Sequence, residues 1–99
     1  MNDNADKETA GGGASYNYLI QFNAGGQWAS DHSVVLLVAD IFQPFGVQVN
    51  DVQVRRESSL YSVSNTNTFP GRRIDIQLLL TKARSFLFML VSDPFPSFD

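Results

Sequence analysis

The amino-acid sequence predicts an α+β domain, with one principal helix packed on an antiparallel sheet of about four to five strands. The first observation is a capped amphipathic segment at Ser30–Gly46, and the second is the alternation of apolar and polar residues over most of the chain that follows. The third is the length of 99 residues, which fits one domain. A helix with a single apolar stripe must bury that stripe, and a strand-rich remainder supplies the sheet to cover.

Residues 1–15 are predicted to form a disordered acidic tail that precedes a single domain of residues 16–99. The tail has no large apolar residue after Met1, and Gly11, Gly12 and Gly13 are costly to order. Its polar, acidic composition differs from that of a secretory signal or an Arg-rich transit peptide.

The first strand is predicted at residues 16–22, where apolar and polar positions alternate. The helix is predicted to begin after Ser30, which is a good N-cap, with Asp31 placed favourably in the first turn. Its apolar side chains fall on one stripe, which consists of Val34, Val35, Val38, Ile41, Phe42 and Phe45. A buried strand is the alternative for this segment, because its first apolar residues are mostly β-branched.

The end of the helix is also marked in the sequence. Pro44 disfavours helical geometry at the preceding residue, so the regular turns are predicted to end near Phe42. Gly46 can then adopt a positive φ as the chain turns away.

The valines after the helix change phase. The first two occupy odd positions and the next two occupy even positions: Val47, Val49, Val52 and Val54. A strand with a period of two cannot bury all of them on one face. The sequence therefore predicts a bulge or a tight two-residue turn at Asn50–Asp51, which would correct the register.

The rest of the chain is predicted to form strands. These strands cover residues 60–63, 74–80 and 85–91, with a polar loop at 64–71 and a hairpin loop at 81–84. The last of them is apolar on both faces, which is typical of a central strand. The element order is then β-α-β-β-β-β. A short helix at residues 82–91 is the alternative, and it gives the β-α-β-β-α order of ferredoxin-like folds.

Composition excludes several classes of function. The chain has no cysteine, so disulfides, thiolate nucleophiles and thiolate metal sites are absent. The cytoplasm, where thiols stay reduced, is the favoured location. The longest apolar runs, Val34–Ala39 and Phe86–Val91, fall far short of the ~20 residues that a membrane-spanning helix needs. The formal net charge of -3 implies no particular partner.

The residues that carry catalytic chemistry do not form a recognisable site. Asp31, the only histidine His32, and Ser33 are sequence neighbours. Adjacent helical side chains do not face each other, so we interpret these residues as a helix cap region. Asp40 lies opposite the apolar stripe, and no carboxylate spacing supports a metal site. Gly25–Gly26 lacks a phosphate-loop motif. The chain is therefore predicted not to be an enzyme and to bind neither a cofactor nor a metal ion.

Two binding functions are kept as alternatives. A small-ligand or regulatory pocket between helix and sheet could be lined by Tyr18, Trp28 and Phe42. Phosphate or nucleic-acid contact could use the basic second half, which contains Arg55, Arg56, Arg72, Arg73, Lys82 and Arg84. Nucleic-acid binding is not favoured, because few aromatic residues accompany these cations and the overall charge is negative.

A non-catalytic protein-interaction or assembly module is the favoured function, with self-association through the sheet surface or edge. One helix leaves part of a four- or five-stranded sheet uncovered, and uncovered apolar surface is a candidate interface. An unpaired edge strand can pair with a second copy or with a partner peptide. The predicted contact residues are Leu36, Leu79, Leu87, Met89, Phe95 and Phe98.

Overall fold

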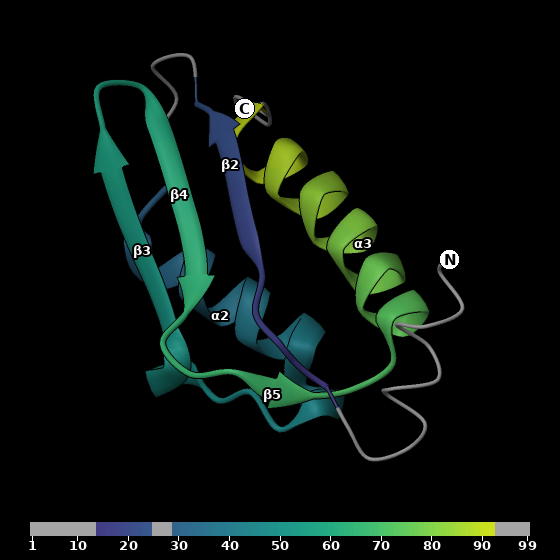
Figure 1. The fold of residues 1–99 in the computed structure, drawn as a ribbon. Helices are drawn as coiled ribbons and strands as arrows, with labels where there is room; N and C mark the ends of the chain where they lie inside the picture. The colour runs from purple at the N-terminus through teal and green to yellow at the C-terminus, as the bar shows by residue number, and fades with distance from the viewer. Residues whose placement is uncertain (1–13, 25–28, 93–99) are drawn as a thin grey trace.

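The computed structural model describes residues 14–24 and 29–92 (Figure 1). The α+β class is confirmed, because helices α2 (Asp31–Phe42) and α3 (Arg73–Ser92) pack on antiparallel sheets of three and two strands. The strands are β1 (Ser15–Tyr16), β2 (Leu19–Asn23), β3 (Val52–Glu57), β4 (Leu60–Asn65) and β5 (Phe69–Pro70).

The three-stranded sheet has β4 at its centre, in the order β2-β4-β3. Both outer strands run antiparallel to β4, so β2 and β3 are parallel to each other and α2 forms the crossover between them. Figure 1 shows α2 behind this sheet and α3 alongside β2. The five principal elements therefore follow the order β-α-β-β-α, which the sequence offers as the alternative.

The helix predicted after Ser30 is confirmed, and both of its ends lie where the sequence predicts them. The Oγ of Ser30 accepts a hydrogen bond from the backbone N–H of Ser33 at 3.1 Å. Regular α-helical turns end at Phe42, and a short 3-10 helix, η1 (Gln43–Phe45), continues the chain. Gly46 then has a φ of 85°, which is the left-handed conformation expected after a helix end.

The phase change among the valines has a simple structural cause. A single 3-10 turn, η2 (Val49–Asp51), stands before β3, so it is this turn that corrects the register, and neither a bulge nor a two-residue turn is present there. The N–H of Gln48 donates to the Asp51 carboxylate at 2.9 Å and closes the turn. Val47 and Val52 on either side are buried, whereas Val49 within the turn is exposed.

The strands predicted at residues 74–80 and 85–91, and the hairpin loop between them, are wrong. Residues 73–92 form the single helix α3. Its buried side chains are spaced by seven, four and four positions, at Ile76, Ala83, Leu87 and Val91. That spacing is the one that a helix with 3.6 residues per turn buries on one side. The expected hairpin at 81–84 contains no Gly, Pro or Asn, so nothing there opposes a continuous helix.

A partly buried polar network marks the point where the N-terminal strand passes from one sheet to the other. The side chain of Asn17 accepts from the N–H of Asn65 at 3.1 Å and donates to its carbonyl at 2.8 Å, as a neighbouring strand would. The Oδ1 of Asn65 in turn accepts from the hydroxyl of Tyr18 at 2.9 Å. The amide of Asn17 thus replaces one backbone pair, and β1 leaves to pair with β5.

The hydrophobic core lies between the two helices and the inner face of the three-stranded sheet. Two stacked aromatic pairs span it: Tyr18 with Phe42, whose ring centroids are 4.5 Å apart, and Phe22 with Tyr61, at 4.7 Å. The largest fully buried side chains are Tyr61, Phe42, Ile20, Leu87, Val34, Val38 and Val63. Each principal element contributes to this core, and the contribution of β3 is Val52, with Val54 packed against it.

Substitution of Tyr18 by Phe tests the polar network. The change leaves the Oδ1 of Asn65 without its donor, so we expect the free energy of unfolding at pH 7 to fall by about 1 to 3 kcal/mol. Urea denaturation of both proteins measures the difference. A variant as stable as the parent would show that this hydrogen bond contributes nothing.

The stabilities of the parent and of Tyr18→Phe are also predicted to respond differently to alkaline pH. Burial, and to a lesser extent the Asp51 carboxylate, raise the pKa of Tyr18 above its ordinary value. Above about pH 10 the unfolded chain therefore loses the Tyr18 proton while the folded chain keeps it. Parent stability should fall with pH in this range, and the fall should be shallower in Tyr18→Phe. Equal slopes would contradict a raised pKa of Tyr18 in the folded protein.

Substitution of Ser58 by Gly should stabilise the β3–β4 hairpin. Ser58 is the first residue of the two-residue loop and has a φ of 55°, which an L-residue adopts at a cost. We expect a gain of roughly 0.5 to 1 kcal/mol in the free energy of unfolding, after allowing for the greater freedom of unfolded glycine. Ser59→Gly is the matched control, and it should give no gain because Ser59 lacks a positive φ.

Candidate interaction surface

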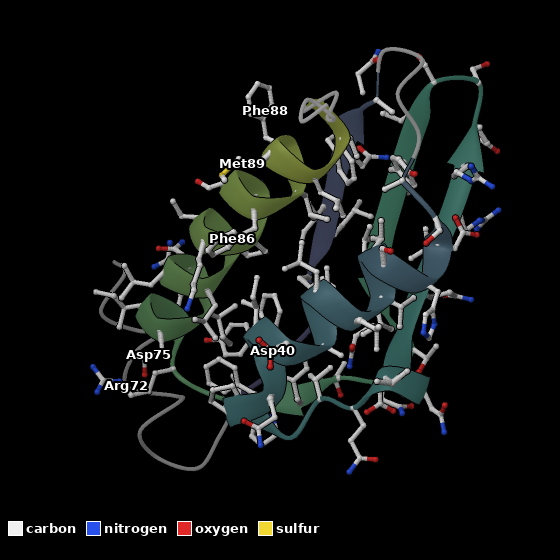
Figure 2. The ribbon with its side chains drawn as sticks, turned by 180° about the vertical axis from the view of Figure 1, so that it is seen from behind. Asp40, Arg72, Asp75, Phe86, Phe88 and Met89 are labelled. Atoms are coloured by element: carbon white, nitrogen blue, oxygen red, sulfur yellow. The ribbon has the colours of Figure 1, made fainter. Side chains whose placement is uncertain are left out.

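Helix α3 exposes an apolar face to solvent in addition to the face that it buries. Four large side chains dominate the exposed face: Phe88 is 69% exposed, Leu78 64%, Met89 58% and Ile74 51%. Figure 2 shows Phe88 and Met89 pointing away from the body of the molecule near the C-terminal end of α3. Exposed apolar side chains are ordinary when scattered, but several on one helix form a patch.

A groove separates this helix from the edge of the sheet. It has a volume of about 540 Å³ and lies between β2 and the second half of α3. Its lining consists of Gln21, Phe22, Arg84, Ser85, Phe88 and Met89. Arg84 is the single charged residue of this lining, so the groove is largely uncharged and continues the apolar surface of α3 toward β2.

The edge of the sheet beside the groove has no paired strand among the described residues, because β2 ends the order β2-β4-β3. The residues of β2 are Leu-Ile-Gln-Phe-Asn, without a charge. The opposite edge, β3, carries Arg55, Arg56 and Glu57. Charged side chains on an edge strand hinder unwanted pairing, so β3 is protected in this way and β2 is not.

The predicted contact residues fall on different parts of the structure. Met89 is exposed on α3 and Leu79 is half-buried there, whereas Leu36 is exposed on α2 beside Val49. Leu87 is fully buried, which corrects its assignment to a contact surface. A strand would put Leu87 and Met89 on one face, but a helix rotates them about 200° apart. Phe95 and Phe98 lie outside the described residues.

Two exposed aromatic side chains of α3 are absent from the predicted contact residues. Phe86 and Phe88 lie on one face of the predicted central strand, but on the helix both are exposed. The signal that identifies them is the helical spacing of Ala83, Leu87 and Val91, which assigns the buried side and leaves Phe88 outside it.

The predicted ligand pocket is occupied by packed side chains where the structure describes it. Tyr18 and Phe42 are both buried, and their rings stack on each other. Trp28 lies outside the described residues. The two rings therefore act as core packing between α2 and the sheet.

The six basic residues do not gather at one place. Arg55 is on the outer face of the sheet, whereas Arg56 is on the inner face, where it pairs with Asp31 at 3.2 Å and lies over the ring of Tyr61. Arg72 pairs with Asp75 at 3.9 Å at the start of α3, far from the tip of β3 (Figures 1 and 2). The others, Arg73, Lys82 and Arg84, are exposed along α3.

The open face of the three-stranded sheet is polar. It forms a shallow depression lined by Leu19, Gln21, Gln53, Arg55, Glu57, Ser62 and Ser64. None of these side chains is aromatic, so this face lacks the rings on which single-stranded nucleic acids stack.

Catalytic geometry is not evident in the described parts of the chain. No group of three His, Asp or Glu side chains among the described residues could hold a metal ion. His32 is exposed in the first turn of α2, and Asp40 is exposed on its outer side (Figure 2). In the ranges that the structure describes, neither helix is long and apolar enough to cross a bilayer.

Comparison of the chain with protein-family models, with curated proteins and with solved structures finds no match.

Paired alanine substitutions on α3 test the assignment of its two faces. Leu87→Ala removes a fully buried side chain and should lower the free energy of unfolding by about 2 to 5 kcal/mol. Leu78→Ala removes an exposed one and should change it by less than about 0.5 kcal/mol. Thermal or urea denaturation compares the two variants. Equal losses would contradict the helical placement of these leucines.

Proposed function

We propose that this chain is a non-catalytic protein-interaction or assembly module that associates with further copies of itself. The observation that carries the proposal is the exposed apolar face of α3, which lies next to a groove and an edge strand without charged residues. Surface of this kind is a liability for an isolated domain, and its burial against another protein is favourable.

The size of the patch supports an interface of modest strength. Ile74, Leu78, Phe88 and Met89 together present roughly 500 Å² if a large apolar side chain carries about 200 Å². Two such patches facing each other bury at most about 1,000 Å², the lower limit for specific association. The self-association that we propose therefore belongs to the small, transient class of interfaces.

The contact is assigned to the helix rather than to the sheet surface that the sequence suggests. The open face of the sheet is polar and offers little apolar area, whereas α3 and the adjoining β2 edge supply both apolar side chains and an uncharged strand. The patch around Leu36 on α2 is smaller, since Leu36 and Val49 are the exposed large apolar residues that line it.

Multi-angle light scattering from about 5 to about 500 µM tests this function over the range expected for a small interface. The parent mass should rise with concentration toward a multiple of the monomer. Leu78→Glu should weaken association at least about tenfold, because it buries a charge in the contact. Leu36→Glu is the matched change on α2 and should leave association unaltered. A parent that stays monomeric throughout would exclude self-association.

A further inference from the structure

The outward stripe of α3 has the same spacing in both directions along the helix. It contains Ile74, Leu78, Ser85 and Met89, which are separated by four, seven and four positions, and Thr81 and Lys82 are exposed at its middle. At 3.6 residues per turn these positions fall on one side of the helix, opposite the buried residues Ala83 and Leu87. A stripe with this symmetry matches a reversed copy of itself.

We infer that two copies associate through α3, packed antiparallel on α3 of the partner subunit, with the two-fold axis passing between Thr81 and Lys82. In this register Ile74 faces Met89 of the partner subunit, and Leu78 faces Ser85 of the partner subunit. A large side chain then meets a small one near the axis, as interdigitating helix surfaces require. A two-fold interface uses the same surface on both copies, which one self-complementary stripe provides.

The helix dipoles favour the antiparallel orientation independently of the apolar spacing. An antiparallel pair brings the positive N-terminal end of one α3 beside the negative C-terminal end of the other. A parallel pair would instead place ends of like sign side by side.

This inference rests on the proposed self-association and goes beyond it in naming the helix, its orientation and its register. The absence of cysteine from the chain makes a direct test available, because any introduced thiol is unique. Leu78→Cys and Ser85→Cys each carry one thiol on the stripe. In the antiparallel pair these two thiols lie opposite each other, within the Cα separation that a disulfide spans.

The experiment compares three samples under mild oxidation, with dimer measured on non-reducing gels. A mixture of Leu78→Cys and Ser85→Cys should form a disulfide dimer several-fold faster than either variant alone, because residues 78 and 85 meet only across the axis. A mixture of Leu36→Cys and Ser85→Cys is the control for random collision. Faster dimer formation by Ser85→Cys alone would indicate parallel helices and overturn the inference.

The remaining outcomes separate this inference from the proposed function. A parent that is monomeric by light scattering at about 500 µM overturns both, since even a small interface associates there. A parent that associates, while the 78/85 mixture crosslinks no faster than the 36/85 control, overturns the geometry and leaves the function standing. If the chain dimerises only after residues 93–99 are removed, the inferred helix pairing is also overturned. That segment would then occupy the exposed face of α3 in the intact chain.

Discussion

The hydrogen bonds between Asn17, Tyr18 and Asn65 are the interaction on which the arrangement of this domain depends. The Asn17 amide satisfies both backbone groups of Asn65, so the N-terminal strand can leave β4 at that point without stranding buried polar groups. The hydroxyl of Tyr18 then reaches Asn65, and its ring stacks on Phe42 of α2. These three side chains thereby join both sheets to α2, and they lie at the end of the hydrophobic core.

The second constraint is the position of β4 between β2 and β3. Because the parallel strands β2 and β3 are separated by β4, the crossover through α2 must pass across β4 on one face of the sheet. Helix α3 is consequently left to the margin beside β2, where it packs on α2 with one side only. Several of its apolar side chains are left exposed by the part of the chain that the structure describes, and the proposed function and dimer both start from that placement.

Local signals in the sequence are reliable where a few neighbouring residues decide the outcome. The capping of α2 by Ser30, its stop before Pro44 and the left-handed Gly46 depend on short-range sterics and hydrogen bonds, and all three are confirmed. The alternation in β2, and the need for a correction near Asn50, are equally local. The site was predicted less well, because Leu87 and Met89 share a face only if their segment is a strand.

The sequence by itself determined the α+β class, the first helix with its ends, and the absence of thiol chemistry. Only the tertiary structure decided the state of residues 73–92, because a segment apolar on both sides satisfies the patterns of a central strand and of a helix alike. Packing of Ala83 and Leu87 into the core selects the helix and thereby turns Phe88 and Met89 outward. Which residues of this segment are buried and which are exposed is therefore a property of the packed domain.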